Sequence, residues 1–190
     1  KDIAEVTIKI HVEDQVTAMR VPVGTDCTER ICNPSVGGSV FAGWFRDSAC
    51  TRPANLSCVT DDMEIYAGFM DGGYLQVAEL PVATGSEMQR IRLMTAVDPV
   101  LTSACGFIIS DENGSAEIRV SDFYSSIEGA DAAELFGVTD EFAKLICHDI
   151  AIPLQEGEKT IAVTPYWVTL SGAKVTGMTK SMTVSARQVH

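Results

Sequence analysis

The sequence predicts a mainly β protein in two parts. Residues 1–70 form a small N-terminal β domain, and residues 74–190 form an antiparallel β-sandwich of immunoglobulin or fibronectin-III type. The first observation behind this prediction is the strict alternation of apolar and polar residues in the opening segments. The second is a series of seven further strand candidates separated by turn signals, the spacing typical of a sandwich. The third is Gly72-Gly73, a flexible polar joint that marks the domain boundary.

The N-terminal part begins with two strands. Residues 6–12 (VTIKIHV) place apolar side chains on one face only, and residues 16–23 alternate in the same way after a short polar link. Together they predict a hairpin. Residues 24–38 are rich in turn formers and hold at most one helical turn. The segments 39–45 (SVFAGWF) and 63–69 (MEIYAGF) predict two more strands, on either side of a cysteine-bearing loop.

The second part contains seven strand candidates and one helix-like interruption at 129–141 (GADAAELFGVTDE). The Asn113-Gly114 dipeptide predicts a hairpin turn, and QEGE and LSGA mark further turns. The strand candidates are YLQVAELPVA (74–83), EMQRIRLMTAV (87–97), ACGFIIS (104–110), EIRVSDFYSSI (117–127), FAKLICHDIAIP (142–153), KTIAVTPYWVTL (159–170) and KVTGMTKSMTVSA (174–186).

Charge and hydropathy exclude several classes of partner. The 14 basic and 26 acidic residues give a formal net charge of −12, which repels nucleic acid and anionic lipid. No apolar run approaches the length of a membrane span, so we expect no membrane insertion. The chain begins with Lys1, and we expect an export signal or anchor to have been removed from it. We therefore expect an extracellular or cell-surface location.

The six cysteines favour disulfides over reduced thiols, because such crosslinks are typical of exported proteins with small cores. None forms a C-x-x-C pair, and six cysteines allow 15 pairings. Cys50 and Cys58 flank a loop that a bridge would hold, and Cys27 and Cys32 would close a second ring, although crossed pairings stay open. Cys105 and Cys147 would lie on neighbouring strands if these are strands C and F of the sandwich; free thiols, for Cys105 above all, are the alternative. The candidate disulfide residues are Cys27, Cys32, Cys50, Cys58, Cys105 and Cys147.

The motifs FAGWFRD (41–47) and VTDDMEIYAGF (59–69) resemble the Listeria–Bacteroides repeat, the B-repeat of internalin-type surface proteins. The pattern of that family is F-x-G-W-Y-x-D followed by V-T-x-D-x-x-L-Y-A-x-W, and the resemblance covers residues 4–69. It implies a small β-grasp-like module of exported, multi-domain proteins that acts as a spacer or adhesive unit. The first four cysteines depart from the family pattern.

The second part resembles a β-sandwich module of surface proteins from gut bacteria. The matching text is RIRLMTAVDP, CGFIIS, FYSSI and IAVTPYWVTLSGAKVTGMTKSMTV. Because this module has no settled activity, the resemblance implies no function for the second part.

The aromatic residues are interpreted first as core. Alternation places Val40, Ala42 and Trp44 on one sheet face and Phe41 and Phe45 on the other, and a Trp on a sheet face of a small domain is usually buried. By the same argument Trp167 is the core tryptophan of the sandwich. Tyr124, in FYSSI, is the best local candidate for a ligand contact.

Polar clusters predict no catalytic centre. Asp61 and Asp62 are expected to cap a strand, and the Asp111–Asn113 segment lacks the spacing of a calcium loop. Cys147 and His148 are adjacent on a strand and point to opposite faces, so they form no nucleophile–base pair. His11 and His190 lie in an N-terminal strand and at the chain end. We expect no cofactor and no enzyme activity.

Two functions follow as expectations. The first is a non-catalytic module of a bacterial surface or secreted protein that acts in adhesion or as a spacer, with a host or cell-envelope protein or glycan as partner. Exposed strand edges would be its natural protein-binding surface. The second is a carbohydrate-binding accessory module of a secreted glycan-degrading system, which requires exposed aromatic side chains such as Tyr124.

Overall fold

The computed structural model describes residues 3–84, 88–153, 158–170 and 172–185. These residues are mainly β, with one short α-helix and one 3-10 turn, which confirms the predicted mainly β fold class. The chain divides into two compact units. Unit 1 is Lys1–Asp71 with Thr169–Ala173, and unit 2 is Gly72–Val168 with Lys174–His190. Neither helical segment of the described chain has the length and hydropathy needed to cross a membrane.

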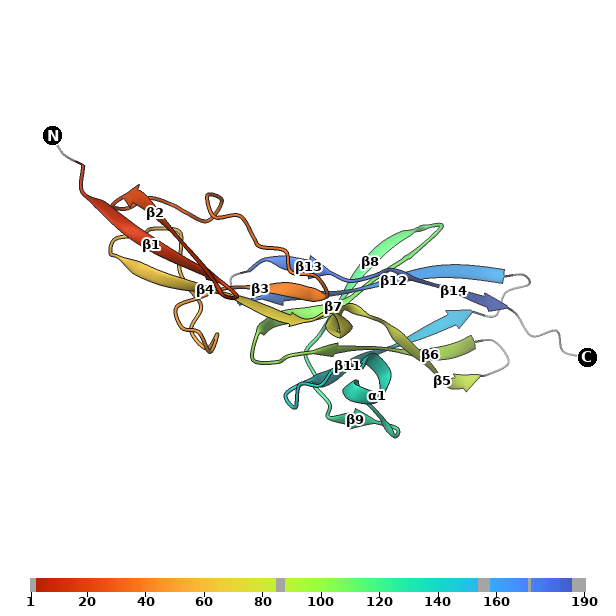
Figure 1. The fold of residues 1–190 in the computed structure, drawn as a ribbon. Helices are drawn as coiled ribbons and strands as arrows, with labels where there is room; N and C mark the ends of the chain where they lie inside the picture. Colours follow the sequence, from red (N-terminus) through yellow and green to blue (C-terminus); the bar gives the residue numbers. More distant parts are fainter. Residues whose placement is uncertain (1–2, 85–87, 154–157, 171, 186–190) are drawn as a thin grey trace, which may run out of the picture. The chain divides into compact units, whose positions relative to one another are not determined.

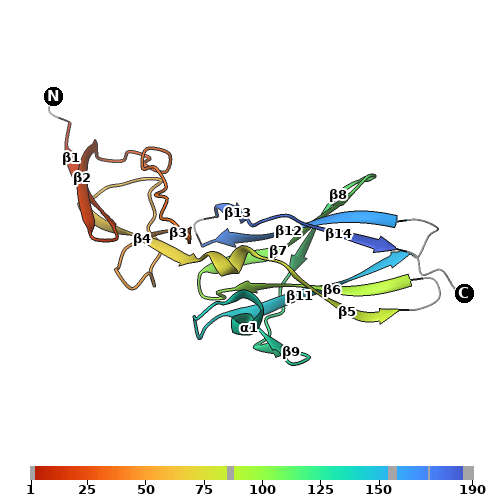
Figure 2. The ribbon, with the colours of Figure 1, turned by 45° about the vertical axis from the view of Figure 1, so that its right-hand side comes forward.

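Unit 1 contains a four-stranded sheet with the strand order β2-β1-β4-β3 (Figures 1 and 2). The outer strands pair antiparallel with their neighbours, whereas the two central strands, β1 and β4, run parallel. Two hairpin-like pairs that are distant in the sequence therefore meet at the centre of one sheet. The strands are β1 (Glu5–Val12), β2 (Gln15–Pro22), β3 (Ser39–Phe45) and β4 (Met63–Asp71).

One face of this sheet carries the core of unit 1. Alternate residues of β1 and β4 point into it, and the connecting segments 23–38 and 46–62 cover it with side chains of their own. A short antiparallel bridge between Thr25 and Val59 ties these two segments together. The core residues are Val6, Ile8, Val21, Cys27, Ile31, Trp44, Leu56, Val59, Met63 and Ile65.

A β-bulge in β3 overturns the prediction that Phe41 and Trp44 lie on opposite faces. The register with β4 shifts between Phe41 and Gly43, so the residue between them, Ala42, is extra to the ladder. Phe41 and Trp44 consequently share a face and make an edge contact, with ring centroids 5.4 Å apart. Gly43 adopts a φ of 132°, a conformation open to glycine and strained for other residues. Phe45 is on the opposite face to Trp44, as the alternation predicts.

Unit 2 contains two main sheets, which form two layers in both ribbon views (Figures 1 and 2). One has the order β11-β6-β5; the other has the order β13-β12-β7-β8, with β14 also paired to β12. Buried side chains of both sheets form the core, among them Leu93, Phe107 and Trp167. The strands are β5 (Ala78–Thr84), β6 (Met88–Val97), β7 (Thr102–Asp111), β8 (Gly114–Val120), β11 (Lys144–Pro153), β12 (Glu158–Thr169), β13 (Lys174–Thr176) and β14 (Lys180–Ser185).

The predicted helix-like interruption is α1 (Ala132–Phe136), which follows the short strands β9 (Ser126–Ile127) and β10 (Ala130–Asp131). Asp131 caps its first turn by accepting a hydrogen bond from the Glu134 amide at 2.8 Å. Gly137 ends it with a φ of 66°. Upstream, the 3-10 turn η1 (Gly72–Leu75) opens unit 2.

Three predicted strands are shorter than expected. The candidate 74–83 becomes a strand only from Ala78, because Gly72–Leu75 form the 3-10 turn η1. The candidate 117–127 is interrupted: β8 ends at Val120, Tyr124 forms an isolated bridge to Leu145, and Ser126–Ile127 form the separate short strand β9. The candidate 174–186 is split into β13 and β14 around Gly177, where the Leu75 carbonyl oxygen would lie 2.1 Å from a β-carbon. Gly177 and Met178 donate their amides to Pro165 and Leu75 respectively, and these bonds interrupt the strand. The predicted turns QEGE (155–158) and LSGA (170–173) each include residues outside those described. His190 also lies outside the described residues.

Gly68 of β4 offers a test of unit 1 packing. A β-carbon at this position would lie 2.4 Å from the ring of Phe45, which is almost fully buried and has little room to move. Gly68→Ala is therefore expected to lower the free energy of unfolding by about 1–3 kcal/mol, as overpacking does. Chemical denaturation measures the change.

Gly37→Ala is the matched control, because a β-carbon there would meet no atom within 4 Å. Equal stability of the two variants would contradict the packing described for Phe45.

Candidate functional site

The solvent face of β1 and β4 gathers the polar side chains of unit 1. Because β1 buries Val6 and Ile8, the alternate residues Thr7, Lys9 and His11 point away from the core. On β4 the same alternation turns Glu64 and Tyr66 outward between buried apolar residues. The parallel register aligns Lys9 with Glu64 and His11 with Tyr66.

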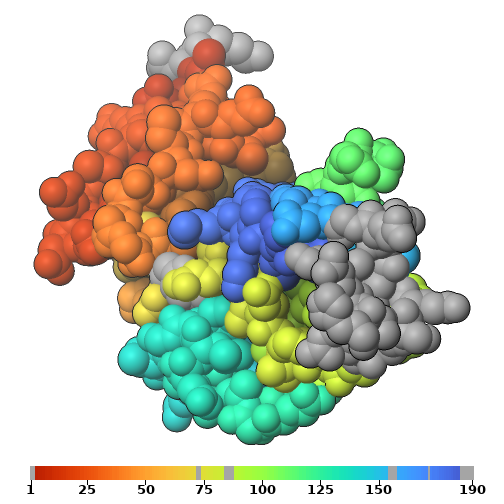
Figure 3. Space-filling view, turned by 90° about the vertical axis from the view of Figure 1, so that its right-hand side faces the viewer, coloured from red at the N-terminus to blue at the C-terminus, as the bar shows by residue number. Residues whose placement is uncertain are grey.

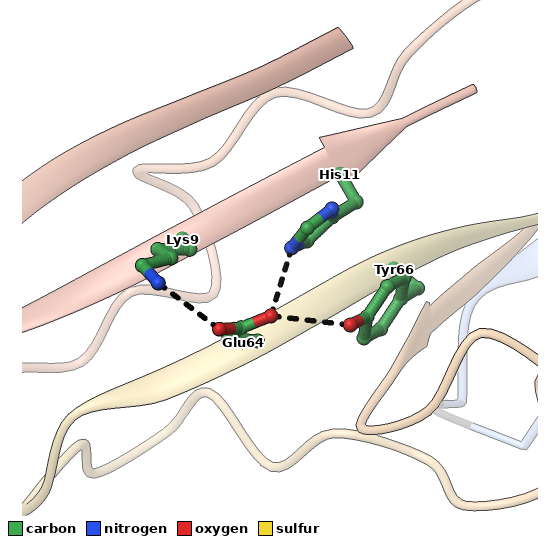
Figure 4. Close-up of polar contacts among 4 residues, drawn as sticks. All are labelled: Lys9, His11, Glu64 and Tyr66. Atoms are coloured by element: carbon green, nitrogen blue, oxygen red, sulfur yellow. Dashed lines mark hydrogen bonds and ion pairs between the residues drawn. The ribbon is translucent and has the colours of Figure 1, made fainter. Parts of the chain in front are cut away.

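Glu64 is the centre of this arrangement (Figure 4). Its carboxylate lies 3.1 Å from the Lys9 ammonium, 3.1 Å from His11 Nε2 and 3.1 Å from the Tyr66 hydroxyl. A carboxylate only accepts hydrogen bonds, so all three neighbours act as donors here. The imidazole also stacks on the Tyr66 ring, with centroids 4.3 Å apart and 16° between the planes. We call Lys9, His11, Glu64 and Tyr66 the Glu64 cluster.

The electrostatics of the Glu64 cluster disfavour proton transfer by Glu64. The hydrogen bond from Lys9, followed by those from Tyr66 and His11, lowers the pKa of Glu64. A carboxylate held in its ionised form in this way is a weak general base. The hydrogen bond to Glu64 in turn raises the pKa of Tyr66, since the anion opposes a second negative charge. The cluster presents paired charges and a stacked aromatic pair on the solvent side of the sheet.

A shallow groove of about 300 Å³ lies beside the Glu64 cluster. Asp62 stands at one end of it, where its Oδ1 accepts a hydrogen bond from the Thr7 amide at 2.7 Å. This bond agrees with the expectation that Asp62 caps a strand. Arg46, the first residue after β3, also borders the groove. The lining residues are Thr7, Lys9, Arg46, Asp62, Met63 and Glu64.

Sequence reasoning missed this site. The local pattern places His11 only in an N-terminal strand and predicts no role for Lys9, Glu64, Tyr66 or Arg46. The alternating polar sets 7/9/11 and 62/64/66 are visible in the sequence. What brings them together is the parallel pairing of β1 with β4, which joins residues 55 apart and is not encoded in either segment by itself.

The structure places both tryptophans in hydrophobic cores. Trp44 is 7% exposed and belongs to the core of unit 1, and Trp167 is 2% exposed in unit 2. Neither indole Nε1 has a hydrogen-bond partner among the described residues.

Tyr124, the predicted ligand contact, lies in unit 2 and is 40% exposed. Its backbone exchanges two hydrogen bonds with Leu145 of β11, at 2.8 and 2.7 Å. Phe123 next to it is similarly exposed. Tyr124 is therefore remote in sequence from the Glu64 cluster and belongs to the other unit.

The cysteines of unit 1 occupy different layers, and each is a free thiol in this structure. Cys27 is buried in the core, where burial raises the pKa of its thiol. Cys50 is half-buried on the opposite sheet face, near Phe45 and Gly68, so a Cys27–Cys50 bridge would have to cross the sheet. Cys32 and Cys58 are exposed. The disulfides of this unit stay a prediction.

Cys105 and Cys147 are also free thiols, and they do not lie on neighbouring strands as expected. Cys105 is on β7, whose partners are β8 and β12, whereas Cys147 is on β11 in the other sheet. The sequence predicts that the strand with Cys147 is strand F, next to the strand with Cys105. In the structure that strand, β11, pairs with β6 in the other sheet. Burial raises the pKa of Cys105 to about 11 and also raises that of Cys147.

The remaining polar candidates have structural partners. Asp111 ends β7, accepts a hydrogen bond from the Asn113 amide and forms an ion pair with Lys159 at 2.9 Å. The tip of this β7–β8 hairpin, green in Figure 3, projects from the surface of unit 2.

Cys147 and His148 pair with different residues of β6, Met94 and Leu93, as successive strand residues must. Within the described ranges, no three His, Cys, Asp or Glu side chains are grouped so as to hold a metal ion.

Comparison with known proteins shows no family for this chain. No protein-family model matches it, and no curated protein matches it. One solved structure with some similarity is described as "X-ray structure of Northeast Structural Genomics Consortium target SoR45". It is 11% identical, with a TM-score of 0.28, and the alignment covers 58% of this chain and 84% of that one.

The burial of the tryptophans predicts their fluorescence. We expect the native protein to emit at the short wavelength of buried indoles, because both rings are excluded from water. The single-tryptophan variants Trp44→Phe and Trp167→Phe separate the two signals. Emission at the long wavelength of a water-exposed indole from the folded Trp167→Phe variant would contradict the core position of Trp44.

The Glu64 cluster predicts a specific titration. Replacing Glu64 by glutamine removes the charge that opposes tyrosinate, so the pKa of Tyr66 should fall toward its ordinary value of 10.0. A native pKa above the unfolded value also means that Tyr66 contributes stability at neutral pH, and that this contribution is lost as pH rises through the native pKa. Ring resonances followed by NMR against pH measure the shift.

Tyr66→Phe identifies which titration belongs to this residue. An unchanged Tyr66 titration in Glu64→Gln would show that the hydroxyl does not sense the carboxylate.

Proposed function

We propose that this chain is a non-catalytic extracellular module of a bacterial cell-surface or secreted protein, acting in adhesion or as a structural spacer. In this proposal, unit 1 is a β-grasp-like repeat of the Listeria–Bacteroides type, and unit 2 is an immunoglobulin-like sandwich.

One observation carries the proposal: the lettered positions of the repeat motif coincide with positions that hold the sheet of unit 1 together. Gly43 forms the bulge in β3, and Trp44 enters the core. Asp47 accepts hydrogen bonds from the Thr51 hydroxyl and amide and the Arg52 amide, which closes the following loop. Asp62 accepts the amide of Thr7. If the defined residues of a motif all serve the fold, the motif is of the kind expected for a repeat module that acts as a spacer.

The strand order of unit 1 also supports the proposal. A β-grasp sheet joins two hairpins through a parallel central pair, and β2-β1-β4-β3 with parallel β1 and β4 is such an order. Residues 23–38, between β2 and β3, take the place of the crossover element that a parallel pair requires.

In unit 2, the division of strands supports an immunoglobulin-like arrangement. The proposal takes β5, β6 and β11 as strands A, B and E, and β7, β12 and β13/β14 as C, F and G; the division of the strands between two sheets supports this assignment, with no strand D in the first sheet as described. β8 then corresponds to C′, and the β9–α1 segment occupies the connection before strand E.

Surface display tests the adhesive role. The chain is displayed on a non-adherent bacterium, and attachment to surfaces coated with extracellular matrix is compared with that of cells displaying an unrelated β-sandwich of the same size. We expect more attached cells with this chain. Equal attachment would exclude adhesion to matrix and leave the spacer role.

The alternative, a carbohydrate-binding accessory module, is supported by the exposure of Tyr124 and Phe123. A glycan array of neutral polysaccharides tests it directly. Binding that is lost in Tyr124→Ala would replace the adhesive proposal with this one.

A further inference from the structure

We propose that strand β8 (Gly114–Val120) is an edge for self-association, at which two copies of this chain join their β8 strands antiparallel around a two-fold axis at Ile118. The inference goes beyond the proposed function, which assigns no partner to any particular edge, and it does not depend on that function. Its first support is the position of β8. This strand is the last of its sheet and pairs, among the strands that the structure describes, with β7 alone (Figure 1).

The β7–β8 hairpin determines which backbone groups of β8 face the open edge. Asp111 and Gly114 flank a two-residue turn, so they form a hydrogen-bonded pair, and the ladder continues along β8 without a register shift. Hydrogen-bonded pairs alternate along an antiparallel ladder, so the even-numbered residues of β8 bond to β7. The amides and carbonyls of Ser115, Glu117 and Arg119 therefore point away from β7, where an added strand would meet them.

The charges of β8 complement those of a second copy. Glu117 and Arg119 are exposed and, two positions apart on a strand, stand on the same face of the sheet. With the axis at Ile118, Glu117 of one copy lies opposite Arg119 of the other, and the symmetry repeats this contact. Each of the two new hydrogen-bonded backbone pairs would thus carry a pair of opposite charges directly across the strands, which is a favourable arrangement.

The same charges disfavour other registers. An axis at Glu117 would place the two carboxylates opposite each other, and an axis at Arg119 would do the same with the two guanidinium groups; like charges directly opposite are unfavourable. Charges of a single sign on an edge would repel a second copy in every register. One anion and one cation, two residues apart, therefore select the register centred on Ile118.

Both side chains can reach a second copy in their present surroundings. Glu117 accepts a hydrogen bond from Lys174, whose ammonium also lies 4.4 Å from the centre of the Tyr166 ring. The Glu117 side chain is nevertheless 51% exposed, and a carboxylate accepts several hydrogen bonds at once. Arg119 is exposed and has no side-chain hydrogen bond or ion pair within the described ranges.

The other strand edges of the described chain lack this combination of features. Register shifts interrupt β3 and β5, and β5 also contains Pro81. Tyr124 already pairs with Leu145 on the outer side of β11. Arg20 is the single charged residue of β2, and β13 and β14 carry only lysines as charged residues. None of these edges presents an anion and a cation to a second copy of itself.

The predicted dimer is a transient one. Pairing around Ile118 overlaps residues 116–120 only, which places the contact among small, transient interfaces. The formal net charge of −12 also opposes the approach of two copies. We expect a reversible monomer–dimer equilibrium with a dissociation constant of about 10 μM or weaker.

Sedimentation velocity of the full chain over a range of protein concentrations tests the inference. Glu117→Arg and Arg119→Glu each place like charges opposite one another in both pairs, so each should weaken the dimer by about tenfold or more. An equimolar mixture of the two variants should dimerise as strongly as the original chain. The reason is that the two cations of the Glu117→Arg copy then face the two anions of the Arg119→Glu copy.

Arg20→Glu is the matched control. It makes the same change in net charge as Arg119→Glu, at an exposed position on the edge strand β2 of unit 1, and should leave the dissociation constant unchanged. The melting temperature of each variant checks that it is folded.

Hydrogen exchange followed by NMR locates the contact. The amides of Glu117 and Arg119 should exchange more slowly at high protein concentration than at low concentration, since they become paired in the dimer. The amide of Ile118 bonds to β7 in either state, and its exchange should not depend on association at the edge.

Four results would overturn the inference. They are a chain that stays monomeric at about 1 mM, a dimer that neither charge reversal weakens, a mixture of the two variants that does not regain dimerisation, and amides of Glu117 and Arg119 that gain no protection. Weakening by Arg20→Glu as large as that by Arg119→Glu would also reject it, because net charge alone would then explain the effect. Attachment to matrix is measured on displaying cells, so the adhesive role and the β8 dimer can fail independently.

Discussion

The parallel pairing of β1 with β4 is the constraint on which unit 1 depends. It joins the N-terminal hairpin to the last strand of the unit and places Ile8 beside Met63 and Ile10 beside Ile65, so that one face of the sheet becomes apolar. The same register necessarily aligns the residues between them on the opposite face, Lys9 with Glu64 and His11 with Tyr66. A one-residue slip would exchange the two faces and expose the core, which is why the register is strongly specified. The polar cluster is thus fixed by the energetics of the apolar side.

The sequence predicted what alternation controls and missed what topology controls. The strand at Glu5–Val12, the hairpin with Gln15–Pro22 and the short helix near residue 132 follow from local patterns. The bulge at Ala42 does not, because it adds one residue without breaking the apolar character of the strand, and it moved Phe41 to the face of Trp44. The break at Gly177 depends on the Leu75 carbonyl, about a hundred residues earlier, and the pairing of Lys9 with Glu64 depends on a crossover. No window of a few residues contains either fact.

The two units use charged groups differently. In unit 2 Arg92 joins the sheet to the turn after β9, with its guanidinium 2.7 Å from Asp149 and 2.7 Å from Glu128, and the pair with Asp149 raises the pKa of Arg92. Such a cation is engaged within the fold, and Glu128 itself holds a left-handed φ of 52°. In unit 1 Arg46 follows β3 as an exposed cation without such partners among the described residues.

Around Lys9 and Glu64, strands β1 and β4 bury one face and expose the other, which separates the residues that stabilise the fold from polar side chains open to solvent. In unit 1 the motif positions Gly43, Trp44 and Asp47 act in the bulge, the core and the loop closure, and a change at any of them alters the sheet. Lys9 and Glu64 lie on exposed strand positions whose backbone is already paired, so side chains there change with little effect on folding. A spacer can therefore acquire a recognition surface without losing its stability. For the proposed adhesive role, the solvent face around Lys9 and Glu64 is therefore a candidate surface beside the strand edges.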